Sequence, residues 1–311
     1  MADSSAVGPD ERGTRPLAAL PDPHVTRREF VTASATVITG CGLIPMVVPL
    51  ARPDQAPARA VDDASIHHGP VEFPSGDGTI DGHLAHPKRE GTFPGIVVIP
   101  GNWIIEPYIP EFAAQLAQAG FAALVVNVYH QFPEVKSWDE AQAVPWETTQ
   151  KIIRESWTDE EMLQDVGAAF DHLRAQTFVS PKKLGITGFC GGGWNAILFA
   201  ADQPQLVAAV VPFYAPPDAA KRFNRPRSVL DVLGELKPPL QAHYGTRDKN
   251  FGVEDIERFR VAAAKLQPPG EVYLYDAEHG FMAYNRDPEF APDAAQQAFE
   301  RAVGFFHRYV G

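Results

Sequence analysis

The chain has 311 residues, of which 27 are basic and 39 acidic, and its net charge is −12. This balance repels nucleic acid phosphates and anionic membrane surfaces, so we expect no nucleic acid partner. The length suffices for one large α/β domain with a full core.

The first 60 residues are expected to be an export signal with its flanking segment. Arg27 and Arg28 stand just before a mostly apolar run that ends at Leu50. A paired arginine in this position favours a twin-arginine signal over an amphipathic helix with two exposed arginines. The twin-arginine export machinery would carry the folded protein to the periplasm or beyond, with cleavage expected after the small-x-small stretch at residues 58–60.

Two other interpretations of this segment stay open. Residues 38–41 resemble a lipoprotein box in which Cys41 would carry a lipid anchor, although the apolar run continues beyond it. A membrane span is disfavoured, because glycines and prolines interrupt a run that would need about 20 apolar residues. If the segment is removed, Cys190 is the only thiol left and no disulfide can form. Residues 61–70 are expected to be a linker, and residues 71–311 the catalytic domain.

Beyond the linker, strand-like runs alternate with amphipathic helices. Residues 71–73 and 80–85 predict an antiparallel pair of edge strands around a turn at residues 75–78. Further strands are expected at residues 95–99, 122–128, 184–189, 206–214, 240–244 and 272–275, and helices at residues 108–119, 159–177, 192–201, 253–266 and 292–309. Continuous apolar strands between helices predict an α/β-hydrolase-like architecture, a mostly parallel central sheet with helices on both faces.

Residues 130–158 break this alternation. They hold Trp138, Trp146 and Trp157 among charged side chains and show no clear strand. Loops above a parallel sheet collect binding residues, which favours an insertion that covers the substrate. A surface helix with a small apolar face is the alternative, and the sequence leaves both open.

The strand at residues 184–189 leads directly into Cys190. The run Gly188-Phe189-Cys190-Gly191-Gly192 has the pattern of a nucleophile elbow, a strained turn that needs small neighbours, with Cys in place of Ser. Such a turn exposes the sulfur at a helix N-terminus, where the partial positive charge lowers the pKa of a thiol. Taken alone, the motif is also compatible with a buried structural cysteine.

An acid and a histidine follow the nucleophile in the chain order that α/β-hydrolases use, each after a later strand. Asp248 comes just after the strand at 240–244, and His279 comes after the strand at 272–275. We therefore predict His279 as the base and Asp248 as the acid that orients it. The competing acids in this part of the chain are Asp231, Asp276 and Glu278.

These residues predict attack of the Cys190 thiolate on a carbonyl carbon, followed by hydrolysis of the acyl-cysteine. The backbone amides of Gly191 and Asn102 are expected to stabilise the oxyanion, since Asn102 lies in the loop after the strand at 95–99. The side chains expected to contact substrate are Trp103, Tyr129, Trp146 and Phe281.

From residue 71 onward the chain resembles the dienelactone hydrolase family, α/β-hydrolases with a Cys, Asp and His triad. The resemblance rests on the elbow motif, on residues 93–99, 107–113 and 294–309, on His243-Tyr244-Gly245-x-x-Asp248, and on His279-Gly280-Phe281. It implies a hydrolase that cleaves a lactone or small carboxylic ester and needs no cofactor.

The chain departs from this family at two positions. The family's glutamate after the first parallel strand, which contacts the resting thiol, is replaced by Gly101, and Glu106 is the only acid nearby. The family's carboxylate-binding arginine is replaced by Ala283, with Arg286 a few residues beyond. An alternative is therefore a ligand-binding scaffold of the same fold with little or no turnover.

A metal enzyme is the third hypothesis. Its only candidate ligands are His67-His68 and His83-x-x-His86, and neither pattern is a recognised metal spacing. Because no glycine-rich phosphate loop occurs, we expect no nucleotide cofactor.

Overall fold

A computed structural model describes residues 61, 63–102, 106–130, 146–155, 158–182, 184–218, 220, 224–286 and 288–311. The strands are β1 (Ile66–Ser75), β2 (Gly78–Pro87), β3 (Gly95–Ile99), β4 (Ala122–Val126), β5 (Leu184–Phe189), β6 (Val207–Phe213), β7 (Gln241–Gly245) and β8 (Glu271–Tyr275). The helices are α2 (Tyr108–Gln118), α4 (Trp146–Glu155), α5 (Asp159–Arg174), α6 (Gly191–Asp202), α7 (Val229–Val232), α8 (Val253–Ala263) and α9 (Pro292–Tyr309), with a 3-10 turn, η1 (Leu233–Glu235).

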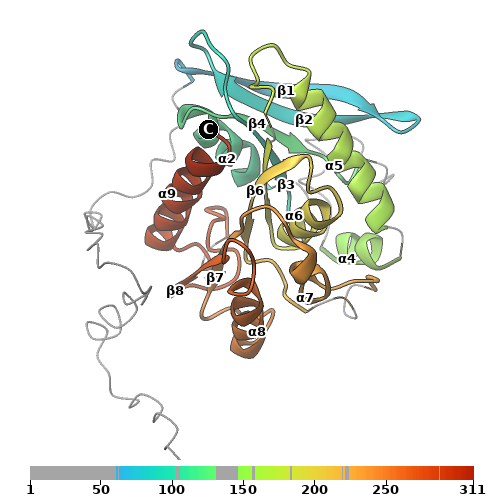
Figure 1. Ribbon diagram of the computed structural model, residues 1–311, viewed down its shortest axis with the longest axis vertical. Coiled ribbons are helices and arrows are strands. Elements are labelled where there is room, and N and C mark those ends of the chain that lie inside the picture. Colours follow the sequence, from blue (N-terminus) through green and yellow to red (C-terminus); the bar gives the residue numbers. More distant parts are fainter. Residues whose placement is uncertain are drawn as a thin grey trace, which may run out of the picture. The chain divides into compact units, whose positions relative to one another are not determined.

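The strands form one sheet in the order β1-β2-β4-β3-β5-β6-β7-β8 (Figure 1). The pairs from β4 to β8 are parallel, whereas β1 pairs antiparallel with β2, and β2 antiparallel with β4. Every residue of β3, β4 and β5 is buried, which explains why these strands are continuous apolar runs. The prediction of a mostly parallel sheet with an α/β-hydrolase fold is confirmed.

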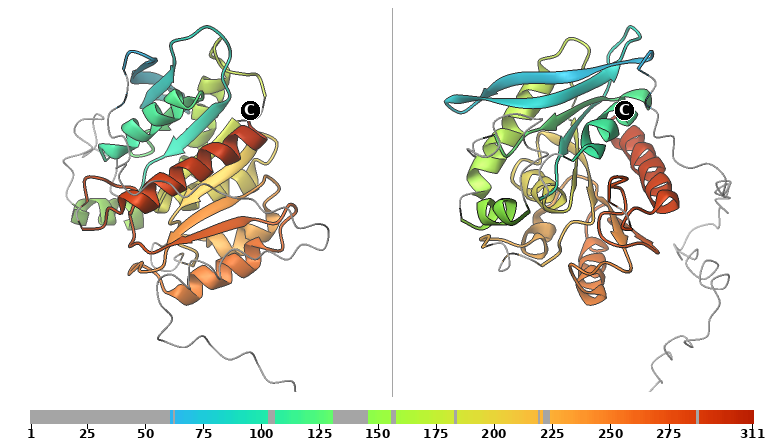
Figure 2. Two further views of the ribbon diagram at one scale, coloured as in Figure 1. Left: turned by 90° about the vertical axis from the view of Figure 1, so that its left-hand side faces the viewer. Right: turned by 180° about the vertical axis from the view of Figure 1, so that it is seen from behind.

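Alternating side chains of the central strands pack into two separate cores. Val97 and Ile99 pack in the core that contains α5, α6, α7 and α8, whereas Ile96 and Val98 pack in the core that contains α2 and α9. Successive side chains of a strand point to opposite faces, so one apolar run supplies both layers. Figure 2 shows α9 crossing one face of the sheet while α5 and α6 cover the other.

The direction in which the chain winds changes at β3. The chain passes from β3 to β4 on one side and then returns to place β5 on the other side of β3. In open parallel sheets, ligands bind at such a switch point, beyond the carboxyl ends of the strands. The loops after β3 and β5 carry Asn102 and Cys190, so the topology alone brings these two predicted site residues to this place.

The structure corrects the predictions in several places. β2 is not an edge strand, because it lies between β1 and β4, and only β1 stands at that edge. Both strands extend well beyond the predicted ranges, since their register continues from Ile66 with Pro87 to Ser75 with Gly78. The short helix α7 was not predicted. In the unassigned stretch 130–158, the described part contains α4 at residues 146–155.

All of the described residues lie within one compact unit, Arg52–Gly311. The predicted export signal and Cys41 lie outside the described residues, and the domain boundaries at residues 60 and 70 stay predictions. In the described part of the chain, no helix is both long and apolar enough to cross a membrane.

Candidate active site

Cys190 occupies a strained turn between β5 and α6. Its backbone angles are φ 52° and ψ −119°, a left-handed conformation that is uncommon outside glycine. Its amide donates to the carbonyl of Phe213 on β6 at 3.0 Å, which fixes the turn to the neighbouring strand. Two glycines permit this turn. A Cβ at Gly188 would lie 2.3 Å from the Gly192 oxygen, and one at Gly192 would lie 2.2 Å from the Pro100 oxygen.

His279 and Asp248 form a short, buried hydrogen bond. Nδ1 of His279 lies 2.6 Å from Oδ2 of Asp248, whose side chain is fully buried. The other neighbour of His279 is Cys190, because the charge of His279 and a hydrogen bond from it lower the pKa of this thiol. With Nδ1 committed to the carboxylate, Nε2 is the nitrogen left for the sulfur. The structure therefore brings the three predicted side chains together in the order thiol, imidazole, carboxylate.

The competing acids are engaged elsewhere. Asp231 caps α7 by accepting from the amide and hydroxyl of Ser228 at 2.8 and 2.9 Å. Asp276 pairs with Arg247 at 2.8 Å, and Glu278 pairs with Lys249 at 3.0 Å. The position of Asp248 directly after a strand was therefore enough to identify the acid that contacts His279.

The surroundings of Cys190 favour its ionised form. Burial alone would raise the pKa of the thiol, but the charge of His279, hydrogen bonds from His279 and the Gly191 amide, and the charge of Arg286 together lower it. Burial alone would lower the pKa of His279, but the charge of Cys190 and hydrogen bonds to Asp248 and Cys190 raise it. Each group therefore stabilises the charged form of the other.

The loop after β3 lies against the elbow. Asn102 is buried, and a Cβ at Gly191 would lie 1.8 Å from its Oδ1. Only a glycine at 191 therefore leaves room for this side chain. The hydroxyl of Tyr129 donates to the Gly101 carbonyl at 2.9 Å and so fixes this loop to the segment after β4. The residues predicted to supply oxyanion amides are thus neighbours at the N-terminus of α6, and their roles stay predictions.

The predicted substrate contacts are only partly described. Trp103 and the side chain of Trp146 lie outside the described residues, as do Trp138 and Trp157. Tyr129 and Phe281 are fully buried. Phe281 packs against Tyr214 and Tyr275 with ring centroids 5.4 and 5.2 Å apart. Both side chains therefore pack in the interior beneath the loops of the site. Their direct contact with substrate stays a prediction.

The structure also contains a buried ion pair near the site, between two residues that the sequence did not predict to be in contact. Arg286 donates to Glu106 through Nε at 2.7 Å and through Nη2 at 2.6 Å. Nearby, the hydroxyls of Tyr108 and Tyr214 lie 3.3 Å apart, and the Tyr214 ring lies 4.9 Å from that of His279. Glu106 and Arg286 were singled out only as replacements for the family's missing charges, and no sequence pattern linked the two.

The histidines considered as metal ligands face one another across β1 and β2. His67 lies opposite His86 with ring centroids 5.1 Å apart, and His68 lies 5.6 Å from His83. Among the described side chains, no group of three or more His, Cys, Asp or Glu is arranged to hold a metal ion.

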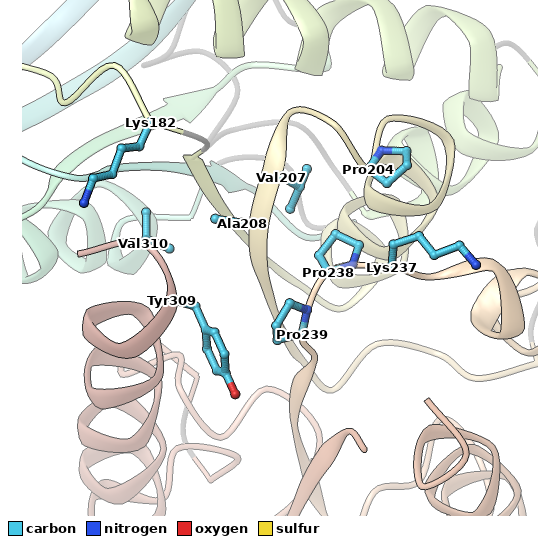
Figure 3. A pocket seen from close by; sticks show the side chains of 9 residues that line it. All are labelled: Lys182, Pro204, Val207, Ala208, Lys237, Pro238, Pro239, Tyr309 and Val310. Atoms are coloured by element: carbon cyan, nitrogen blue, oxygen red, sulfur yellow. The ribbon is translucent and has the colours of Figure 1, made fainter. Parts of the chain in front are cut away.

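A cavity of about 400 Å³ (Figure 3) lies at the amino ends of the central parallel strands, whereas Cys190 follows the carboxyl end of β5. Its lining comes from the amino end of β6, the segments before β5 and β7, and the end of α9: Lys182, Pro204, Val207, Ala208, Lys237, Pro238, Pro239, Tyr309 and Val310. These side chains include no Ser, Cys, His, Asp or Glu, so this cavity lacks the groups of a hydrolytic triad, which lie around Cys190 instead.

Two proteins of known name resemble this chain over most of its length. A Methylorubrum extorquens protein named as a carboxymethylenebutenolidase is 28% identical over 251 residues, which cover 80% of this chain and 84% of that protein. A Bradyrhizobium protein named as a 2-oxo-3-(5-oxofuran-2-ylidene)propanoate lactonase is 32% identical over 225 residues, 71% of this chain and 86% of that protein.

The same similarity extends to solved structures. A Klebsiella pneumoniae protein described as a dienelactone hydrolase superimposes with a TM-score of 0.71 at 26% identity, covering 79% of this chain and all of that one. The pattern of the dienelactone hydrolase family matches residues 80–310. That match spans β2 to α9 and includes the elbow, the acid and the histidine. The chain therefore belongs to the dienelactone hydrolase family, a family of hydrolases.

Proposed function

We propose that the protein hydrolyses lactones or small carboxylic esters through an acyl-cysteine intermediate on Cys190. The observation that carries the proposal is the strained turn that holds Cys190 at the N-terminus of α6, next to a His279 that is hydrogen-bonded to the buried Asp248 and lowers the pKa of the thiol. The names of the relatives as carboxymethylenebutenolidase and lactonase support the same class of bond. Both the triad and the intermediate are part of the proposal.

In the first half-reaction, the Cys190 thiolate forms a bond to the carbonyl carbon, and the π electrons move to the oxygen. The amides of Gly191 and Asn102 would stabilise this oxyanion, whose charge develops only during the reaction. Collapse then breaks the carbon–oxygen bond, and the leaving alkoxide takes the proton of the His279 imidazolium. In a lactone, the released alcohol stays attached to the acyl group.

In the second half-reaction, His279 removes a proton from water and the hydroxide attacks the acyl carbon. The carbon–sulfur bond breaks, the carboxylic acid is released, and Cys190 and His279 return to thiolate and imidazolium. Asp248 takes no proton. It holds the imidazole in one orientation and stabilises its positive charge.

The arrangement around His279 favours uncharged substrates. Ala283 supplies no cation where the family is expected to hold a substrate carboxylate. Arg286, the nearest arginine along the chain, is already engaged by Glu106 through two hydrogen bonds. We therefore expect neutral esters and lactones to be turned over faster than anionic ones of similar size.

The proposal is tested by comparing wild type with Cys190→Ala on p-nitrophenyl acetate and on a neutral aryl lactone. We expect kcat/KM to fall by about 10³-fold or more in the variant, because the nucleophile is lost. Cys41→Ala serves as the matched thiol control and should behave as wild type. Equal activity of wild type and Cys190→Ala would reject Cys190 as the nucleophile, and binding without turnover by wild type would favour the scaffold alternative.

We further propose that the enzyme is exported in a folded state by the twin-arginine machinery. The support is the paired Arg27 and Arg28 before an apolar run. Replacing both arginines with lysine should retain the protein inside the cell. The mass of the N-terminus of the wild-type protein after export would distinguish cleavage near residue 60 from lipidation at Cys41.

A further inference from the structure

His279 is held at one nitrogen by a hydrogen bond and at its ring by two aromatic side chains. Its Nδ1 lies 2.6 Å from Oδ2 of Asp248. The ring centroid of Tyr214 lies 4.9 Å from that of His279, with the two planes at 59°, and the ring of Phe251 lies 5.6 Å away, edge to face at 85°. Aromatic rings attract one another at such distances and angles. The imidazole therefore has contacts that restrict its plane as well as its position.

The hydrogen bond to Asp248 does not by itself fix the imidazole. A ring that is bound at Nδ1 can still tilt about that hydrogen bond, and the tilt moves Nε2 on the far side of the ring. A general base transfers a proton only when its nitrogen lies within hydrogen-bond reach of the reacting group. Contacts on the ring of His279 therefore decide where Nε2 points.

Tyr214 has a strained backbone conformation directly after β6. Its φ is 40°, and among the described residues other than glycine only Cys190 and Asn224 also have a positive φ. A bulky side chain rarely adopts this region, and such strain persists where the surrounding structure enforces it, commonly at functional sites. Glycine would adopt the same conformation freely. The side chain of Tyr214 must therefore contribute enough to outweigh the strain.

One peptide group connects this residue to the nucleophile turn. The carbonyl of Phe213 accepts from the amide of Cys190 at 3.0 Å, and the amide of Tyr214 donates to the carbonyl of His243 on β7 at 2.7 Å. That carbonyl and that amide belong to the same peptide bond. The ring that contacts His279 is thus attached next to a peptide that is fixed to the Cys190 turn on one side and to β7 on the other.

The ring of Tyr214 has little freedom of its own. The residue is 1% exposed. Its ring packs against Phe281 with centroids 5.4 Å apart, and its hydroxyl lies 3.3 Å from that of Tyr108. Phe251 is less constrained, since it is partly buried in the loop between β7 and α8. Tyr214 is therefore the more rigid of the two rings that limit the tilt of the imidazole.

Phe112 shows how a ring with only a packing role differs from Tyr214. It is 3% exposed on α2, and its ring packs against Phe189 and Phe213, the residues directly before Cys190 and Tyr214. Its backbone is helical, and its ring does not contact His279. The same core is thus filled by unstrained rings, and filling space does not explain the strain at Tyr214.

We propose that Tyr214, assisted by Phe251, is a positioning residue that fixes the plane of the His279 imidazole and so directs Nε2 toward Cys190. This inference rests on the proposed function, because it concerns the proposed base. Tyr214 acts through His279, and its ring rather than its hydroxyl is the part that matters.

The first test compares Tyr214→Leu and Tyr214→Phe with wild type on p-nitrophenyl acetate. Tyr214→Leu keeps an apolar side chain but removes the ring, and kcat/KM should fall about tenfold because Nε2 is less often in place. Tyr214→Phe keeps the ring and should stay within about threefold of wild type. A loss in Tyr214→Phe as large as in Tyr214→Leu would overturn the inference, because the hydroxyl would then be the important group.

The decisive comparison repeats Tyr214→Leu in a His279→Ala background. Acetylation of Cys190 is followed in a single turnover with enzyme in excess, and the modified peptide is quantified by mass spectrometry. Once the imidazole is absent there is nothing to position, so Tyr214→Leu should change this rate by less than about twofold. A loss of about tenfold in this background as well would overturn the inference. The ring would then support the nucleophile turn or the fold rather than the base.

Phe112→Leu is the matched control, because it removes a buried ring from the same core without touching His279. Its kcat/KM should stay within about threefold of wild type, whatever it costs in stability. A folded Phe112→Leu protein that loses as much activity as Tyr214→Leu would count against the inference.

If Tyr214→Leu fails to fold, Phe251→Leu tests the second ring at a partly buried position. It should lower kcat/KM about threefold when His279 is present and have no effect in His279→Ala. Equal effects in the two backgrounds, or none in either, would overturn the inference.

These results are separate from the proposed function. Full turnover by Cys190→Ala rejects the nucleophile. Unchanged kcat/KM in a folded Tyr214→Leu protein, with Cys190→Ala inactive, rejects only the positioning role.

Discussion

Among the residues that the structure describes, two His–Asp pairs have a buried aspartate, and they differ in the position of the neighbouring hydroxyl or thiol group. In the first, His279 Nδ1 lies 2.6 Å from Asp248, and the histidine lowers the pKa of the Cys190 thiol on its other side. In the second, His130 Nε2 lies 3.1 Å from Asp165, and the Ser75 hydroxyl donates to the same carboxylate at 2.6 Å. Each set thus contains a cysteine or serine, a histidine and an aspartate.

The order of contacts decides what each set can do. In the first, the imidazole stands between the thiol and the carboxylate, so it can exchange a proton with sulfur while Asp248 orients it. In the second, Asp165 stands between Ser75 and His130 and accepts from both. Ser75 therefore does not contact the histidine, and Asp165 joins the end of β1, the segment after β4, and α5. The presence of triad residue types alone does not make a catalytic site.

The largest expected difference between the two pairs is in turnover. Asp248→Asn should lower kcat/KM on p-nitrophenyl acetate by about 10³ to 10⁴-fold, because His279 loses the group that fixes its orientation. Asp165→Asn should remain within about threefold of wild type. Similar losses in both variants, measured on folded protein, would show that the contact order does not separate the two roles.

The second difference is in stability. Asp165→Ala leaves Ser75 and His130 without their shared partner and should lower the free energy of unfolding by about 2–3 kcal/mol, measured by urea denaturation. The matched control is Asp276→Ala, whose side chain is 68% exposed and pairs with the half-exposed Arg247. It should change stability by less than about 0.5 kcal/mol. Comparable effects at both positions would remove the structural role of Asp165.

A buried histidine without a carboxylate partner should titrate in the opposite direction to His279. His243 on β7 contacts Tyr275 and Gln241, and burial together with Arg301 lowers its pKa to about 3. Below about pH 6.5 this histidine therefore binds a proton in the unfolded chain but stays neutral in the folded chain. Stability should fall by about 1.4 kcal/mol per pH unit as pH decreases through this range.

His83 contributes a second proton between pH 6.5 and about 4, since burial and His68 lower its pKa to about 4. His279 has a raised pKa, so its contribution is complete below pH 6.5 and is lost only as pH rises above neutrality. Urea denaturation of wild type and His243→Gln between pH 4 and 8 measures the difference. An identical slope in both proteins would contradict the assignment of this proton to His243.

The smallest effect is expected at Ser75. Ser75→Ala removes one hydrogen bond to Asp165 and should cost about 1 kcal/mol of folding free energy, with His130 still in place. Its kcat/KM should equal that of wild type. Loss of turnover in a stable Ser75→Ala protein would indicate that this hydroxyl takes part in the chemistry.

The central strands were predictable because burial on both faces leaves an unambiguous pattern. The ranges predicted for β3, β5 and α9 match the structure at both ends. The ends of β1 and β2 were missed because most of their outer residues are histidine, glycine, proline or other residues that give no apolar alternation, and backbone pairing extends the two strands. Helix α7 has only four residues, too few to show the 3.6-residue repeat of apolar side chains. Its only signal in the sequence is the capping box Ser228-x-x-Asp231.

For the candidate site, chain order and strand ends located Cys190, Asp248 and His279, since this topology places each after the carboxyl end of a strand. The pairing of Glu106 with Arg286 could not be predicted, because its partners are 180 residues apart on irregular loops. The same holds for Asp165, whose contacts to Ser75 and His130 depend on the docking of α5 against the sheet. Local patterns carry no information about such contacts.

The central claim is that Cys190 becomes acylated during turnover. Intact-protein and peptide mass spectrometry after rapid acid quench of a reaction with p-nitrophenyl acetate measures this directly. An acetyl adduct on the peptide carrying Cys190 in wild type, accumulating in Asp248→Asn and absent in Cys190→Ala, is the predicted result. Sustained ester hydrolysis with no adduct on Cys190 in either wild type or Asp248→Asn would contradict the account.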